Sequence, residues 1–242
     1  MSFRVSCIGV EPFLSYNEFQ EINSQKQSLN KESGWIPGVS INHLWTTDAG
    51  NIESAFAFSG GNVDYHGQTQ LGTPHQTVTR HRHLDIGARF FPKVFTIYRD
   101  NGWQANLFAS IHYRYWYRDI QAAQGVTRLT EDYSWQILGL GISVNRARHD
   151  VALWFGRNIN AQVRVRETSC FDDFMLYPKQ DNAYNIEYAF ETTERSYFIM
   201  KYQSSRLSRS ADKSVNTCAG LLRFHEPASE MKQLVLGIGW LF

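Results

Sequence analysis

The residues best suited to chemistry stand close together at positions 80–85, in the order Arg-His-Arg-His-Leu-Asp. If this segment is a β-strand, His81, His83 and Asp85 share one face, opposite Leu84 and Ile86. Two histidines at this spacing can chelate a metal ion, and a nearby carboxylate can orient an imidazole. His81, His83 and Asp85 are therefore candidate catalytic residues. The competing interpretation, which we favour, is a packed polar network inside a small barrel, with no metal and no cofactor.

Further charged residues fall on the corresponding faces of other segments. The predicted luminal charge network consists of His112, Arg114, Arg118, Arg164, Arg166, Glu187 and Glu191. Charged groups in a narrow lumen must be paired or hydrated, so we expect Arg164 and Arg166 to pair with Glu187 across neighbouring strands. A narrow pore with a basic constriction that favours anions is the functional alternative.

The segment Trp103–Arg118 shows the kind of element that must position these residues. Every second residue from Trp103 to Tyr117 is apolar or amphipathic, whereas the residues between them are mostly polar. This period of two, kept over sixteen residues, predicts one long strand between two different environments. A tilted strand that crosses a membrane needs roughly 9–11 residues and extends beyond the bilayer on either side.

The same alternation recurs along the chain and predicts about ten strands, with eight or twelve as alternatives. We expect strands over 3–15, 35–46, 52–65, 83–90, 103–118, 132–145, 151–166, 184–191, 196–205 and 231–242. Short turns are expected at 47–51, 99–102, 147–150 and 193–195, where Asp, Asn, Gly or Thr occur. Longer polar stretches lie near 16–34, 66–77, 119–131, 167–183 and 206–230. This asymmetry predicts a single barrel domain over 1–242, with short periplasmic turns and longer extracellular loops.

One residue conflicts with this pattern. Arg157 falls on the apolar face of its strand, where an arginine in the middle of a bilayer costs about 2–4 kcal/mol. We expect either a bulge that exchanges the two faces or a side chain that reaches the interface.

Composition agrees with a barrel. Aromatic residues make up 14% of the 242 residues, while the mean hydropathy is −0.40. A polar average excludes a helical membrane protein but suits a barrel, in which only alternate residues meet lipid. The formal net charge of +1 gives no indication of nucleic-acid binding. The first residues lack the features of a signal peptide, so we expect the mature part of an exported protein.

The last predicted strand carries the most specific motif. Leu234, Leu236, Ile238, Trp240 and Phe242 share one face, and Gly237 stands three residues before Trp240. This arrangement resembles the C-terminal signal of bacterial outer-membrane β-barrel proteins, with Val235 as a departure from the polar residue usual there. The resemblance implies that the barrel assembly machinery recognises Gly237, Trp240 and Phe242. It points to a class of protein and to no particular member.

Three features concern the ends of the predicted strands. Arg80 and Arg82 have the outward parity near the external rim, where they are placed to meet lipopolysaccharide phosphates or only solvent. The loop 171–177 is apolar and acidic and is expected to fold inward as a partial plug or cap. Cys170 and Cys218 lie in loops on the same side, so a disulfide between them is possible.

The sequence therefore predicts a monomeric, porin-like, all-β transmembrane barrel at the surface of a Gram-negative bacterium. We expect a structural, surface-interaction or narrow-channel role, with outer-membrane lipid and lipopolysaccharide as partners. The first alternative is an outer-membrane enzyme, protease-like or acting on lipid A, that uses luminal His and Asp. The second is a soluble lipocalin-like barrel, which requires the apolar parity to face inward.

Overall fold

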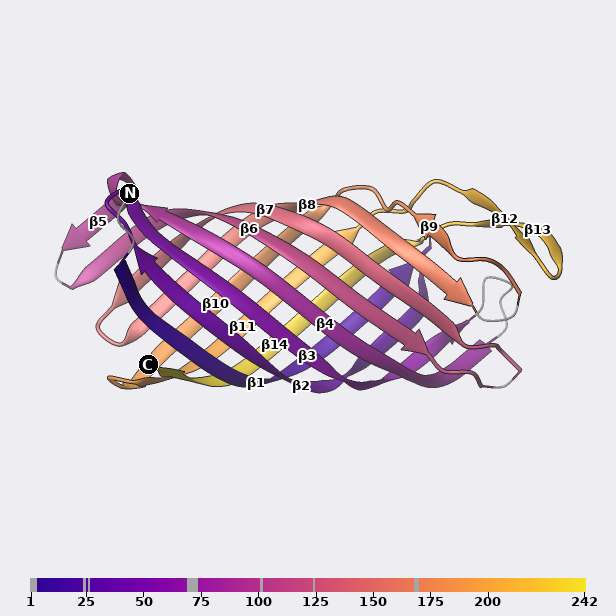
Figure 1. Cartoon of the computed structure of the whole chain (residues 1–242), viewed down its shortest axis with the longest axis horizontal. Coiled ribbons are helices and arrows are strands. Elements are labelled where there is room, and N and C mark those ends of the chain that lie inside the picture. Colours follow the sequence, from indigo (N-terminus) through magenta and orange to yellow (C-terminus); the bar gives the residue numbers. More distant parts are fainter. Residues whose placement is uncertain are drawn as a thin grey trace.

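The computed structural model describes residues 4–23, 25, 27–68, 74–100, 102–123, 125–167 and 170–242. Ten antiparallel strands form one closed barrel (Figure 1), which confirms the predicted fold class. The barrel strands are β1 (Arg4–Ile22), β2 (Ser28–Thr46), β3 (Gly50–Gln68), β4 (Pro74–Pro92), β6 (Trp103–Ile120), β7 (Leu129–Arg146), β8 (His149–Glu167), β10 (Asn182–Thr193), β11 (Ser196–Leu207) and β14 (Ala228–Leu241). Each strand pairs with the next one in the barrel, and pairing of β14 with β1 closes the sheet.

The remaining elements lie at the two ends of the barrel. At the end with short turns, a 3₁₀ turn (Lys93–Phe95) leads into β5 (Thr96–Asp100), which pairs with β6. At the other end, β9 (Phe174–Leu176) pairs with β8, and β12 (Lys213–Thr217) and β13 (Gly220–Phe224) form a separate hairpin. No helix among the described residues is long and apolar enough to span a membrane.

The strands are longer than predicted, and three of the five predicted loops are correspondingly short. β1 and β2 are separated only by residues 23–27, so the predicted loop 16–34 is wrong. β3 extends to Gln68 and β4 begins at Pro74, which leaves residues 69–73, outside the described part, between them. β6 and β7 likewise take up the two ends of 119–131 and leave residues 121–128 between them. The connections after β8 and β11 are long, as predicted.

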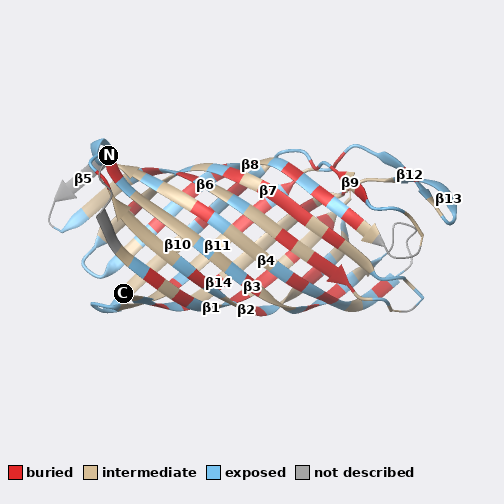
Figure 2. Cartoon of the chain, in the orientation of Figure 1, coloured by how far each residue is buried: buried red, intermediate tan, exposed pale blue. Residues whose placement is uncertain are grey.

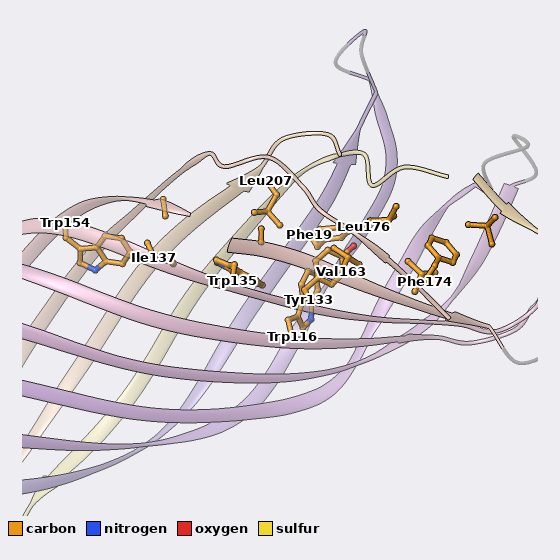
Figure 3. Packing of buried hydrophobic residues seen from close by; sticks show 14 of the residues in the cluster. Phe19, Trp116, Tyr133, Trp135, Ile137, Trp154, Val163, Phe174, Leu176 and Leu207 are labelled. Carbon is orange, nitrogen blue, oxygen red and sulfur yellow. The ribbon is translucent and has the colours of Figure 1, made fainter. Parts of the chain in front are cut away.

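Burial alternates along much of the barrel wall (Figure 2). The outer face, which is the exposed one, carries the apolar side chains. On the outer wall, Leu140 is 73% exposed and Ile111 is 51% exposed. On the inner wall, charged side chains such as Glu32 and Arg118 are buried. Apolar side chains also fill the inner wall near the end with long connections, where Phe19, Trp135 and other residues form one packed cluster (Figure 3).

A bulge in β8 exchanges the two faces of that strand. Ser134 pairs with Gln162 and Gln136 pairs with Ile159, so two residues of β8 stand opposite a single residue of β7. One of these two is Asn160, whose φ of 53° lies in the left-handed region. The bulge follows Arg157, which therefore stays on the outer wall and is exposed. The predicted bulge exists, but it leaves Arg157 on the apolar outer face and so does not remove the conflict for which we expected it.

The left-handed backbone at Asn160 gives a direct test of this bulge. Asn160→Val should lower the free energy of unfolding by roughly 1–3 kcal/mol, because a β-branched residue is strained at this φ. Asn160→Gly should leave it nearly unchanged, because glycine adopts this conformation without strain. Urea unfolding of both variants in detergent, followed by circular dichroism, measures the difference. Equal midpoints for the two variants would argue against a strained bulge.

Candidate functional site

The interior holds three sets of paired charged and polar side chains at different levels. The first, here named the Arg118 cluster, lies near the end with long connections and is centred on the buried Arg118. Its Nη2 donates to Glu32 Oε1 at 2.7 Å, and its Nη1 lies 3.4 Å from Glu21 Oε1 and also donates to Glu131. The guanidinium carbon lies 4.1 Å from the ring centre of Phe19. One cation thus joins β1, β2, β6 and β7 across the lumen.

His81 is part of this cluster. Its Nε2 lies 2.6 Å from Glu32 Oε2, and Thr79 Oγ1 donates to Glu32 Oε1 at 2.9 Å. The imidazole packs edge-on against Trp116, with ring centres 5.1 Å apart, and is buried. His83 stacks on the same indole, with ring centres 5.4 Å apart. Both histidines point inward, as predicted, and both are held by packing.

The Arg118 cluster is acid-rich because a fourth carboxyl group joins it from a connection between strands. Glu226 lies on the segment between β13 and β14 and is buried. Tyr133 Oη donates to Glu226 Oε1 at 2.6 Å and accepts from Arg118 Nη1 at 3.0 Å. Burial, followed by the nearby Glu131 and Glu21, raises the pKa of Glu226 well above its usual range. The outer connection is therefore tied to the barrel interior through a carboxyl group that favours its neutral form.

A second set, the Arg114 bridge, crosses the middle of the lumen. Arg114 Nε donates to Asp85 Oδ2 at 2.6 Å, and His112 Nδ1 lies 3.2 Å from Asp85 Oδ1. On the far side Arg114 Nη2 donates to Gln203, which in turn donates to Gln233. Asp85 is therefore engaged with Arg114 and His112, while His81 and His83 are held in the Arg118 cluster and on Trp116.

A glycine makes room for His112 in this bridge. A Cβ atom at Gly87 would lie 2.4 Å from His112 Nδ1, closer than atoms can approach without displacement. Gly87 therefore lets the imidazole lie against β4, within reach of Asp85.

The third set, the Arg89 bridge, lies nearer the end with short turns. Arg89 Nη2 donates to Glu187 Oε2 at 2.7 Å, and Arg89 Nη1 lies 3.8 Å from Glu53 Oε2. Lys201 Nζ lies 3.9 Å from Glu187 and 3.5 Å from Glu11. These contacts join β4, β10, β11 and β1. All three sets cross the lumen and stabilise inward charges by pairing them.

Some predicted site residues lie elsewhere. The bulge at Asn160 turns Arg164 and Arg166 to the outer wall, so their placement in the lumen and their pairing with Glu187 are wrong. Arg164 instead donates to Asp173 at 2.7 Å, and Arg166 donates to Asp132. Glu191 lies exposed near the short-turn end of β10. His112, Arg114, Arg118 and Glu187 do face the lumen.

Sequence reasoning missed several interior residues. They are Glu11, Glu21, Glu32, Arg89, Glu131, Lys201 and Glu226. Glu21, Glu32 and Glu131 fell in segments assigned to loops, because their strands are polar on both faces beyond the apolar belt. Arg89 shares the parity of Asp85 within the predicted strand 83–90, so the alternation already placed it inside, although the predicted charge network did not include it.

At the end with long connections, the segments 170–176 and 213–226, here named the cap, pack side chains against the interior cluster. Phe174 and Leu176 are buried against the interior cluster, but β9 itself pairs with β8 and so continues the barrel wall. The inward fold predicted for the loop 171–177 is therefore limited to these side chains. Phe171, Phe174 and Phe224 contact one another with ring centres 5.1–5.6 Å apart. A disulfide joins Cys170 to Cys218 and so connects the segment after β8 to the β12–β13 hairpin. In the part of the chain that the structure describes, no His, Cys, Asp and Glu side chains are grouped to hold a metal ion.

Comparison with known proteins supports the fold. No family model matches the sequence, and no curated protein is significantly similar to it. The chain has the fold of the outer membrane protease OmpT from Escherichia coli, with a TM-score of 0.58 and 10% identity over 100% of this chain and 99% of that one. Weaker similarities, too low to support an argument, link it to Ail of Yersinia pestis and Neisserial surface protein A. Their TM-scores are 0.41 and 0.42, with 9% and 11% identity, over 98% and 99% of this chain and the same shares of those chains. The class that emerges is the closed ten-stranded barrel.

The Arg118 cluster should contribute strongly to stability. Arg118→Met should lower the free energy of unfolding by about 3–5 kcal/mol, because it leaves buried carboxylates without their cation. The matched control is Arg166→Met, which removes an ion pair on the outer wall and should cost only about 0–1 kcal/mol. Urea unfolding in detergent measures both. Similar losses in the two variants would contradict a central role for Arg118.

The raised pKa of Glu226 predicts that the cap loosens with increasing pH. A carboxyl group with a raised pKa in the folded state stabilises fully below its unfolded value of 4.5, and this contribution is lost as pH rises towards the folded pKa. Trypsin should therefore cleave near Arg209 and Arg223 faster as pH rises, beyond the change in protease activity. Glu226→Gln, which stays neutral, should remove this excess. The same pH dependence in both proteins would show that Glu226 does not hold the cap.

Proposed function

We propose that this chain is an integral protein of the bacterial outer membrane. The observation that carries the proposal is the inverted distribution of side chains. Apolar side chains such as Leu140 and Phe155 project from the outer wall, whereas charged side chains are buried inside. In a soluble barrel this arrangement would leave a continuous apolar surface in water. In a bilayer the same arrangement places apolar side chains against lipid and polar side chains in the lumen.

Aromatic residues mark the two borders of the apolar surface. On β2, Trp35 and Trp45 stand ten residues apart on the outer face, as do Trp103 and Tyr113 on β6. Ten residues at about 3.3 Å each, tilted by about 40°, span roughly 25 Å. This equals the height of the apolar band of outer-membrane barrels, about 25 Å, which aromatic girdles flank.

The same distribution weighs against the soluble lipocalin-like alternative. That alternative requires the apolar parity to line a ligand cavity, whereas Arg89, Arg114 and Glu187 face the lumen here. The fold shared with an outer membrane protease agrees with the membrane proposal but does not carry it.

Within the membrane we propose a structural or surface-interaction role. The three transverse sets of side chains and the cap obstruct the lumen, which weighs against the narrow channel that the sequence also allowed. The enzyme alternative has less support, because His81, His83 and Asp85 are engaged with structural partners.

Two kinds of partner belong to the proposal. Arg80 and Arg82 are exposed on the outer wall of β4, near the end with long connections, where phosphates of lipopolysaccharide are the expected ligands. Trp240 and Ile238 are exposed on the outer face of β14, the strand that closes the barrel. We propose that the assembly machinery recognises this strand through Gly237, Trp240 and Phe242.

The proposal predicts heat-modifiable migration. Protein refolded in detergent should migrate differently on a gel before and after boiling, and the shift should require detergent or lipid, because the outer wall needs an apolar solvent. The folded protein should show no steady conductance in a planar bilayer. A monomer that is soluble without detergent and shows no shift would refute the membrane proposal. A peptidase or lipid A-modifying activity that disappears in His83→Ala, with folding intact, would favour the enzyme alternative.

A further inference from the structure

The barrel interior contains a cavity of about 410 Å³. Part of its wall carries only short side chains, because Ser40 pairs with Ala57 and Asn42 pairs with Ala55 on the neighbouring strands β2 and β3. Inward side chains normally fill the interior of a small barrel, so these four positions leave space. Ala57 is opposite Asp85 in register, and Ala55 lies nearer the short turns. The space therefore lies on the short-turn side of the Arg114 bridge.

This part of the cavity, here named the β3 pocket, is formed by Leu44, Glu53, Ala55 and Ala57. The two alanines and Leu44 give it an apolar lining. Leu241, which pairs with β1 across the closing seam, also lines the cavity near the short turns. Pockets that bind small molecules have this composition, with a predominantly apolar lining and a few polar groups that orient the ligand.

Glu53 provides the polar group. It precedes Ala55 and Ala57 at the next inward position of β3, so its carboxylate stands at the short-turn end of the pocket. The side chain is 46% exposed although it faces the lumen, so solvent reaches it. Its ion-pair partner Arg89 lies 3.8 Å away, which is too far for a hydrogen bond. Glu53 is therefore available to a cationic ligand that enters from the end with short turns.

The charges around Glu53 also favour a cation. Four carboxylates line this side of the cavity against two cations, from Glu11, Glu53, Asp150 and Glu187 against Arg89 and Lys201. Arg89 donates to Glu187 at 2.7 Å, and Lys201 lies 3.5 Å from Glu11, so both cations are engaged with carboxylates other than Glu53. An anionic ligand would be repelled here, whereas an ammonium group would reduce the excess negative charge.

We propose that the β3 pocket binds a small apolar monoamine of the arylalkylamine class. The ammonium group pairs with Glu53, and the apolar body lies along Ala55 and Ala57. Inward positions of one strand are about 7 Å apart, so a ligand about 8 Å long contacts all three residues from one end of the pocket. Binding needs no contact beyond the Arg114 bridge. The site goes beyond a structural or surface role, and it does not depend on which compartment the short turns face.

The first experiment titrates the refolded protein in detergent with 2-phenylethylamine and measures the heat of binding. Saturable binding is expected, and 2-phenylethanol, which lacks the ammonium group, should bind about tenfold or more weakly. Ala57→Phe fills the pocket and should abolish saturable binding, so its titration also measures the uptake of ligand by the micelles. Equal binding of the alcohol would overturn the assignment of Glu53. No saturable binding above that of Ala57→Phe would overturn the proposal.

Two further ligands test the chemical class. L-Phenylalanine adds a carboxylate next to the ammonium group and should bind about tenfold or more weakly than 2-phenylethylamine, because the carboxylates around Glu53 repel it. Methylammonium keeps the charge but lacks the apolar body, and it should not compete at equal concentration. Equal binding of L-phenylalanine would contradict the role of the negative charge. Effective competition by methylammonium would contradict the role of the apolar lining.

Matched variants locate the site. Glu53→Gln should weaken binding of 2-phenylethylamine about tenfold, whereas Glu191→Gln, on the exposed end of β10, should leave it unchanged. Full affinity in Glu53→Gln would place the ligand elsewhere and contradict the proposal. The gel shift on boiling is recorded for each variant, so that a failure to fold is distinguished from a loss of binding. Ala55→Leu, a smaller change in the same pocket, replaces Ala57→Phe if that variant does not fold.

Discussion

The interior depends on the pairing of charges that cannot reach bulk water. Arg118 provides the clearest case, since one buried guanidinium serves Glu21, Glu32 and Glu131 and stacks on Phe19. Without its cation, each of these carboxylates would carry a desolvation cost of several kcal/mol. Because Arg118 and these partners together come from four strands, the pairing also fixes how those strands lie relative to one another. Arg118 also donates to Tyr133, which donates to Glu226 on the connection between β13 and β14. This chain of hydrogen bonds links the cap to the barrel.

The closed sheet and the apolar outer face both follow from placing a β-sheet in a bilayer. A strand in a bilayer must satisfy its backbone by pairing on both sides, and pairing of β14 with β1 removes the last free edges. Once the sheet is closed, the alternation of side chains leaves each residue either outside or inside. Apolar residues then cover the outer wall, and polar residues must find partners across a narrow lumen. An interior cavity of about 410 Å³ remains, lined in part by small residues on β2 and β3 such as Ser40, Ala55 and Ala57.

Much of this architecture is predictable from alternation alone. The long run from Trp103 to Arg118 defines a strand whose inner face carries His112, Arg114 and Arg118, as the structure shows. The errors come from two physical causes. Beyond the apolar belt the strands are polar on both faces. The sequence around Glu21, Glu32 and Glu131 therefore shows no apolar–polar alternation from which their inward direction could be predicted. The bulge depends on a single left-handed residue, Asn160, and it turns the side chains of Arg164 and Arg166 from the inner to the outer face. The alternation of apolar residues in the sequence continues unchanged through it. Contacts between distant segments, such as the disulfide from Cys170 to Cys218, follow from the fold and could be stated only as possible beforehand.

The central claim is that the outer wall of the barrel faces lipid. Spin labels placed one at a time along β6, from position 105 to 113, in a Cys7→Ser background and in phospholipid vesicles, test it most directly. Collision with oxygen should be high and collision with a water-soluble nickel complex low at every second position, in phase with Leu107 and Ile111. High nickel accessibility at Leu107 and Ile111, or an alternation in the opposite phase, would contradict it.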